Sequence, residues 1–295
     1  RRMTPALSPR SIPKSISKQR FATWVLPLLA VLWLAVLFGA PLLGSTALSL
    51  RSVFDGDPTA TAIFWQLRLP RVLLGLLAGG ALALAGLSFQ TVFRNPLAEP
   101  YTLGVAGGAA LGASLALRWG EGRGLLGLSI IALASFAGAL AATGLVLALA
   151  ARRADDSGTL LLAGVGVSLS TSAVILFLQY LSDATQTFRM VRWMMGGLSV
   201  VGYREVLWLA PWTLAGLVVI LAARWDLDLL LAGDEIAASR GVDVPRLRLR
   251  LLLAVSLMIG ALVAVAGPIG FVGLVVPHLL RRAVGARHLA LAPAC

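Results

Sequence analysis

The sequence predicts an all-α protein whose helices form a polytopic transmembrane bundle. Hydrophobic residues make up 58% of the 295 residues, charged residues only 13%, and the mean hydropathy is +0.88. A soluble domain carries about 25% charged residues. Here the charges lie in short stretches between apolar runs, which reach the ~18–20 residues that span a bilayer as a helix. The sequence lacks the ~10-residue alternating segments of a transmembrane β-barrel.

Eight apolar runs give the expected order of helices. The first run follows residues 1–20, a basic, proline-containing stretch with no apolar core, which is interpreted as a disordered cytoplasmic tail. The last two runs are joined by Gly267-Pro268, so the final run is expected to be short or re-entrant. All eight belong to one expected transmembrane domain, residues 21–295. The runs cover residues 22–43, 67–92, 101–118, 125–151, 159–182, 205–223, 250–267 and 269–285.

The distribution of charge predicts the orientation of the chain. The net charge of +12 comes mainly from arginines at the ends of the apolar runs, as the positive-inside rule expects, so nucleic acid is rejected as a partner. With the N-terminus in the cytoplasm, 17 of the 25 basic residues fall on the inner side. Cys295, the single cysteine, allows neither an internal disulfide nor a cysteine metal cluster, and no metal site is expected.

The expected helix centres carry almost no ionisable residues. They contain Gln90, Gln179 and some hydroxyl groups, whereas His278 and His288 are interpreted as polar residues at helix ends. An ion-coupled transporter usually needs acids or bases at mid-membrane depth, and a haem-holding subunit would need paired histidines. Neither lysine follows a glycine, so there is no P-loop and any ATP with its Mg²⁺ must bind another polypeptide. No catalytic residue and no bound cofactor are expected.

Two local patterns predict packing and docking. Glycines spaced four residues apart, Gly75/Gly79 and Gly104/Gly108/Gly112, favour close helix contacts. Within residues 224–250, interpreted as a cytoplasmic loop, Asp234 to Arg240 is expected to form a short amphipathic helix that stops at Gly241. Such a helix would suit the docking of a soluble partner, although an ordinary solvated loop is the alternative.

Several motifs resemble one known family in order and spacing, over roughly residues 22–295. The sequence resembles the FecCD/BtuC-type permeases, the membrane subunits of type II ABC importers for vitamin B12, haem and ferric siderophores. The motifs are Arg68-Leu-Pro-Arg71, Arg94-Asn-Pro-Leu-Ala-Glu-Pro100, Leu160-Leu-Leu-Ala-Gly164, Trp193-Met-Met-Gly-Gly197, Gly233-Asp-Glu235, Gly241-Val242 and Gly267-Pro-Ile-Gly-Phe-Val-Gly-Leu-Val-Val-Pro-His278.

The resemblance implies a permease of about ten helices in the inner membrane, of which about eight are expected here, with the C-terminal ones apparently missing. It also implies a homodimer, two ATP-binding cassette subunits and an extracytoplasmic substrate-binding protein, and import by alternating access. The matching positions are Arg68 and Arg71 for docking of the binding protein; Asn95, Leu97 and Ser157 for the cytoplasmic gate; Gly233, Asp234, Glu235, Ala238, Arg240 and Gly241 for coupling to the ATPase; and Arg189, Arg192, Trp193, Met194, Gly196 and Gly197 for the outer mouth of the pathway.

Two departures from the family pattern affect these expectations. The gate loop reads Asp156-Ser-Gly-Thr159 rather than a more Ser/Thr-rich form, and Arg240 stands where leucine is usual. An ion-coupled secondary transporter or channel is the main alternative function, and a non-transporting membrane scaffold is another. Formation of a complex with an ATPase through residues 224–250 would separate the importer from both.

Overall fold

The computed structural model describes residues 14–44, 50–119, 129–150 and 157–295. Six helical spans in these ranges are long and apolar enough to cross a membrane, which confirms the expected all-α, polytopic class. The spans are Trp24–Leu42, Pro58–Val92, Ile130–Leu149, Gly158–Tyr180, Arg204–Ala222 and Val244–Ala266.

The described residues are mainly helical, and no strand occurs among them. The α-helices are α1 Lys14–Gly39, α2 Leu50–Phe54, α3 Pro58–Ala62, α4 Leu69–Val92, α5 Val105–Trp119, α6 Ile130–Ala150, α7 Ser157–Tyr180, α8 Ala184–Met194, α9 Arg204–Ala222, α10 Arg224–Ala232, α11 Asp234–Ser239, α12 Val244–Ala266, α13 Val272–Val284 and α14 His288–Ala294. Short η elements at Ala40–Leu42, Ile63–Arg68 (a π-helix) and Pro100–Leu103 link some of them.

Each of the eight apolar runs contains a helix, but two of these helices are short. The run 101–118 forms α5 with 15 residues, and the run 269–285 forms α13 with 13 residues, as expected for a short final segment. At ~1.5 Å per residue, neither helix reaches across a ~30 Å hydrocarbon core. Both begin after a turn that contains a glycine, Gly104 for α5 and Gly270 for α13.

Two boundaries differ from the sequence prediction. The tail predicted for residues 1–20 is wrong at its end, because α1 begins at Lys14; residues 1–13 lie outside the described residues. The segment 224–250, expected to be a cytoplasmic loop with one short helix, is helical over most of its length: it consists of α10, α11 and the first turns of α12, which begins at Val244 and not near residue 250. The charges that interrupt the hydropathy there lie at helix ends, on exposed helix faces or, for Arg248, in a buried ion pair, so they do not interrupt the helical backbone.

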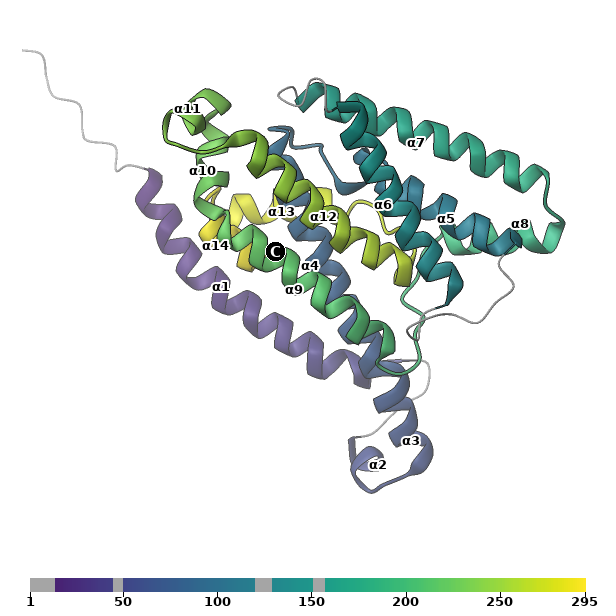
Figure 1. The fold of residues 1–295 in the computed structure, drawn as a ribbon. Helices are drawn as coiled ribbons and strands as arrows, with labels where there is room; N and C mark the ends of the chain where they lie inside the picture. Colours follow the sequence, from purple (N-terminus) through teal and green to yellow (C-terminus); the bar gives the residue numbers. More distant parts are fainter. Residues whose placement is uncertain (1–13, 45–49, 120–128, 151–156) are drawn as a thin grey trace, which may run out of the picture.

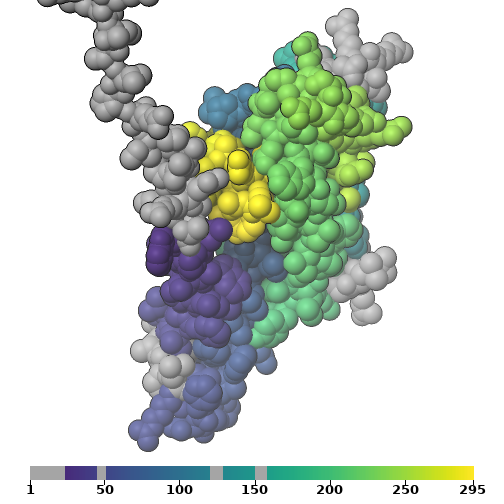
Figure 2. Space-filling model, turned by 90° about the vertical axis from the view of Figure 1, so that its left-hand side faces the viewer, coloured from purple at the N-terminus to yellow at the C-terminus, as the bar shows by residue number. Residues whose placement is uncertain are grey.

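Helices α4 and α12 form the buried centre of the bundle. About two thirds of each span is buried, and their side chains dominate the apolar core. Helix α1 lies along one side, almost fully exposed (Figure 1). Figure 2 shows the C-terminal α13 and α14 between α1 and the α9–α10 segment, in agreement with their contacts.

The two ends of the bundle carry different features. Helix α11 lies at one end, and α2 and α3 lie at the other (Figure 1). The Arg68–Arg71 motif is on the side of α2 and α3, because π-helix Ile63–Arg68 follows α3 directly. The motifs expected to meet a binding protein and an ATPase are therefore at opposite ends of the molecule.

Close packing of α5 against α6 depends on glycine. A Cβ on Gly108 would collide with the backbone of Gly138, and one on Gly112 would collide with the Ala134 carbonyl. This confirms the close contact expected from the second glycine series. The Gly75/Gly79 step is different, because a Cβ on Gly79 would meet nothing within 4 Å.

Prolines in this bundle leave carbonyl groups that distant segments satisfy. Pro70 cannot donate to the carbonyl of Gln66 one turn earlier, and the N–H of Gly202 donates to that carbonyl at 2.7 Å. This bond holds the π-helix Ile63–Arg68, which leads into α4, to the segment that precedes α9. A second example is the carbonyl of Gly273 on α13, to which the side chain of Gln90 donates.

Candidate functional site

Helix α11 has the form that the sequence predicts, with an identifiable stop. The N–H of Val242 donates to Ala237 O at 3.1 Å and that of Gly241 donates to Ala238 O at 2.9 Å. Gly241 has φ +86°. This is the Schellman arrangement that ends a helix at a left-handed glycine. The glycine that ends α11 is close in the sequence to the start of the helix, so both ends could be predicted from the local sequence.

The two faces of α11 differ. Ala237 is buried and Asp234 is half-buried, so this side of the helix faces the bundle. Ile236 is 49% exposed. The exposed side comprises Glu235, Ile236, Ala238, Ser239 and Arg240. Ile236 had no assigned role in the sequence analysis, because a single apolar residue on a surface is common and does not by itself indicate docking.

Asp234 connects α11 to two other helices. Its Oδ2 accepts from Arg248 of α12 at 2.7 Å, and its Oδ1 lies 3.6 Å from Arg94 Nη2, just beyond the end of α4. The Arg248 side chain is 4% exposed, whereas those of Arg94 and Asp234 are 46% and 33% exposed. The sequence analysis placed Asp234 on the coupling helix but found neither arginine partner.

The candidate gate loop begins at Arg94, whose side chain lies 3.6 Å from Asp234 at the start of α11. Arg94 has φ +46°, a left-handed conformation that is uncommon for a residue with a side chain. Asn95 Oδ1 then accepts from the N–H of Leu97 at 2.9 Å, and Leu97 is 68% exposed. Ser157 is the first residue of α7, and the residues before it, 151–156, lie outside the described residues. The gate assignment therefore stays a prediction.

Residues just after the gate loop attach to the turn between α12 and α13. The hydroxyl of Tyr101 donates to Ile269 O and accepts from Ile269 N, both at 2.8 Å. The Glu99 carboxylate accepts from the N–H of Phe271, and its partial burial, the larger effect, raises its pKa above the usual range. Both residues had no assigned role in the sequence analysis, although Glu99 belongs to a quoted motif.

The candidate outer mouth is a short helix followed by a glycine turn. Asp183 caps α8 by accepting from Gln186 N at 2.8 Å. Arg189, Arg192 and Met194 are exposed on α8, while Trp193 is half-buried.

The turn itself packs against the end of α12. Gly197 N donates to Ala266 O at 2.7 Å. A Cβ on Gly267 would lie 2.8 Å from both Gly196 Cα and Trp193 O. The structure thus brings together two motifs, Trp193–Gly197 and Gly267–His278, that are separated by 70 residues in the sequence.

The two candidate docking arginines have different surroundings. Arg68 Nη1 donates to the carbonyls of Pro41 and Leu42 at 3.2 Å each, so its guanidinium is held against the end of α1. Arg71 is exposed. Arg71 is therefore the more exposed of the two, and the docking role of both stays a prediction.

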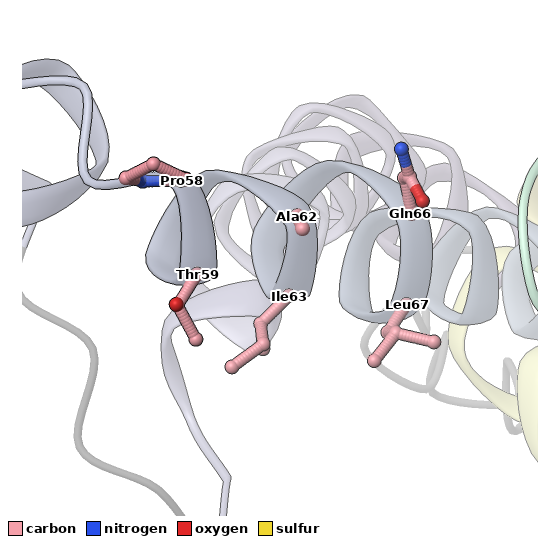
Figure 3. Close-up of a pocket in the computed structure, with 6 residues that line it drawn as sticks. All are labelled: Pro58, Thr59, Ala62, Ile63, Gln66 and Leu67. Atoms are coloured by element: carbon pink, nitrogen blue, oxygen red, sulfur yellow. The ribbon is translucent and has the colours of Figure 1, made fainter.

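A shallow groove of about 460 Å³ lies on the helical span Pro58–Val92, which also carries Arg71. Figure 3 shows Thr59, Ile63 and Leu67 along one side of this span. Arg71 is four residues beyond Leu67, about one turn further along the helix. The groove is lined by Pro58, Thr59, Ala62, Ile63, Gln66 and Leu67.

Comparisons with known proteins agree with this architecture. A model of the FecCD transport family matches residues 28–295. The vitamin B12 import system permease protein BtuC of Serratia proteamaculans (strain 568) is 38% identical over 268 residues, 91% of this chain and 79% of that protein. The hemin transport system permease protein HmuU of Yersinia pestis is 37% identical over 272 residues, 91% of this chain and 81% of that protein. A solved structure of an inward-facing, metal-chelate type ABC transporter matches with a TM-score of 0.84 and 30% identity, over 92% of this chain and 85% of that chain.

This chain belongs to the FecCD transport family. The expectation of an ABC-transporter permease, a multi-pass membrane subunit that works with a separate ATPase and a binding protein, is thereby confirmed. The ion-coupled transporter is not supported by any of these matches. The assignments of single residues to docking, gating and coupling stay predictions.

One further polar cluster of this FecCD-family permease went unrecognised in the sequence. His288 does begin a helix, as expected, but it is fully buried. Its Nδ1 lies 2.6 Å from Asp228 Oδ1, and its Nε2 lies 3.0 Å from Thr91 Oγ1. Burial lowers the pKa of His288, against the opposing effect of Asp228. The cluster ties α14 to α10 and α4. Within the described residues, no group of three His, Cys, Asp or Glu side chains could hold a metal ion.

Proposed function

We propose that this permease carries a bulky metal chelate, of the cobalamin, haem or ferric-siderophore class, from a binding protein to the cytoplasm. The observation that carries the proposal is its similarity, at 37–38% identity over nine tenths of the chain, to permeases named for vitamin B12 and for hemin. The two identities are nearly equal, so the proposal names a class of cargo and not one compound.

The apolar character of the helices supports this class of cargo. The buried polar residues of the described core are few and most bond within the bundle, such as Ser88 and Thr91 to carbonyls one turn earlier. A small ion would need a charged site at membrane depth. A large chelate that a binding protein has already selected needs only a weakly binding path.

We assign the end that carries α11 to the cytoplasm, with the N-terminus on the same side. The charge distribution supports this orientation. The exposed face of α11, with Ile236 at its centre, would then meet an ATPase subunit, and Arg71 at the opposite end would meet acidic residues of the binding protein. ATP would bind the ATPase subunit and not this chain.

We assign the exposed face of α7 to the interface of a permease homodimer, each copy of which would meet one of two ATPase subunits. Only 22% of this span is buried, and Leu162, Leu169 and Phe177 are each at least 60% exposed. A groove of about 340 Å³ lies between α6 and α7, lined by Leu145, Leu149, Ala163, Gly166, Val167, Ser170 and Thr171. A second copy facing α7 would enclose a pathway with small hydroxyl groups in an otherwise apolar wall.

In this mechanism, ATP closes the two ATPase subunits and thereby moves α11. Asn95, Leu97 and Ser157 would open or close the cytoplasmic gate in response. Arg189, Arg192, Trp193 and Met194, with the Gly196–Gly197 turn, would form the outer mouth. Alternating opening of the two ends moves the chelate in one direction.

The test is uptake into liposomes that contain the full-length permease with its ATPase and binding-protein partners. Cobalamin, haem and a ferric siderophore are offered in turn, with and without ATP. ATP-dependent accumulation of one of them is the expected result. Accumulation without ATP would replace the proposal with a secondary transporter or channel. Hydrolysis of ATP without accumulation of any of the three would contradict the proposed cargo class.

A further inference from the structure

We infer that the Arg94–Asp234 ion pair is a switchable link through which α11 positions the gate loop. Arg94 and Asp234 are positioning residues in this proposal, which rests on the proposed coupling role of α11. Asp234 is the first residue of α11, and Arg94 directly precedes Asn95 of the gate loop. Among the described residues, this ion pair joins α11 to the loop after α4.

The two contacts of Asp234 differ in strength. The contact with Arg248 is short, 2.7 Å, and the arginine is buried, with 4% of its side chain exposed. Removing one partner of such a buried pair is costly, because the other charge stays desolvated. Asp234 therefore keeps α11 attached to α12 throughout, and α11 and the start of α12 move as one unit.

The contact with Arg94 is longer, and its arginine is more exposed. The Nη2–Oδ1 distance is 3.6 Å, beyond hydrogen-bond length, and the Arg94 side chain is 46% exposed, whereas the Oδ1 atom of Asp234 is itself buried. Because no hydrogen bond joins the two atoms and the Arg94 guanidinium can reach water, separating this pair costs less than separating Asp234 from the buried Arg248. A displacement of α11 by the ATPase would therefore change this contact before it changed the contact with Arg248.

The backbone at Arg94 explains how such a change reaches the gate. Its φ of +46° is sparsely populated for a residue with a Cβ, and it turns the chain from α4 into the Asn95–Leu97 turn. Surrounding contacts must hold this conformation. The pair with Asp234 is one of them, so loss of the pair frees the start of the loop that carries Leu97.

The test compares three variants in the complete complex of permease, ATPase and binding protein: Arg94→Gln, Asp234→Asn and the double variant. The readout is the number of chelate molecules imported per ATP hydrolysed. Arg94→Gln is expected to assemble normally but to import roughly threefold less per ATP. Because Asp234→Asn already removes the link, the double variant should be no worse than Asp234→Asn. Arg94→Lys, which keeps the charge, should recover part of the loss.

The matched control is Arg246→Gln. Arg246 is a similarly placed cytoplasmic arginine, but its ion pair is with Asp243, three residues away on the same turn. It should leave the import ratio unchanged. The link is refuted if Arg94→Gln imports as well as the wild type, if the two single effects multiply in the double variant, or if Arg246→Gln loses as much.

A second measurement does not depend on the identity of the cargo. A spin label at Leu97→Cys, in a Cys295→Ser background, reports movement of the gate loop when the ATPase is trapped with ATP. The wild-type label is expected to move, and the label in Arg94→Gln to move less. Equal movement would overturn the link. Failure of the wild-type permease to bind an ATPase at all would instead overturn the proposed function.

Discussion

The side-chain amide of Gln90 on α4 donates to the carbonyl of Gly273 on α13 at 3.3 Å. That carbonyl lies one turn before Pro277, which has no N–H to donate to it. The other end of the amide is also used, because Arg281 donates to Gln90 Oε1 at 3.2 Å. Gln90 thus donates to the carbonyl that Pro277 leaves without a backbone donor. The bond also fixes α13 against α4 at the centre of the bundle.

Gln90→Leu should destabilise the permease by about 1–2 kcal/mol. The change leaves the Gly273 carbonyl and the Arg281 guanidinium without this partner in a buried place, whereas the shape of the side chain is nearly kept. The measurement is the apparent unfolding temperature of the purified protein in detergent. The control is Gln179→Leu, because Gln179 donates only a long 3.9 Å contact to the sulfur of Met194. Equal shifts for the two variants would argue against the role of Gln90.

The partner of Gln90 could not be predicted from the sequence. Gln90 stood out as a polar residue in an apolar run, but its partner is 183 residues further along the chain. Hydropathy gives the depth of a residue in the membrane and not its neighbours. Helix α11 was predictable for the opposite reason: its acidic start and its glycine stop lie within eight residues.

The difference between local signals and distant partners also explains what the sequence left out at Arg68 and in the segment 224–250. The motif Arg68–Arg71 suggested two equivalent outward arginines, yet only tertiary structure shows that Arg68 reaches back to the end of α1. The loop predicted at 224–250 was inferred from its charge, and Asp228 supplies part of that charge while accepting from buried His288. A charge that is paired in the fold does not exclude a helix.

Gly86→Ala should prevent normal packing of α13 on α4. A Cβ at position 86 would collide with the carbonyl of Gly273 and lie 2.7 Å from its Cα, and backbone atoms cannot move aside as a flexible side chain can. The measurement is the yield of monodisperse protein after extraction from the membrane, which should fall severely.

Gly79→Ala is the matched control for Gly86→Ala. It lies on the same helix, and its new methyl group would meet nothing within 4 Å. Since alanine is the better helix former by about 1 kcal/mol, this variant should fold at least as well as the wild type. A normal yield for both variants would show that α4 and α13 do not approach as closely as described.

Arg71→Glu and Arg68→Gln should have different effects: the first on affinity for the binding protein, the second on the unfolding temperature of the permease. Arg71 is exposed, so reversing its charge should weaken binding of the binding protein by about tenfold, ~1.4 kcal/mol, mainly through slower association. Arg68→Gln should lower the unfolding temperature, because the carbonyls of Pro41 and Leu42 lose their donor. Affinity, association rate and their dependence on salt are measured for both variants. Unchanged affinity in Arg71→Glu would rule out its docking role.

Ala237→Pro should abolish association with the ATPase while the transmembrane bundle stays folded. The substitution removes the hydrogen bond from Ala237 N to Gly233 O, 2.9 Å, and a proline inside a helix costs about 3 kcal/mol. Helix α11 is only six residues long and would unfold, so Ile236 and its exposed neighbours would lose their arrangement. Co-purification with the ATPase measures the effect, and the unfolding temperature of the isolated permease shows whether the bundle survives.

Ala237→Gly is the control, because it keeps the N–H and should retain most of the association. A normal complex with Ala237→Pro would mean that the ATPase binds this permease somewhere other than α11.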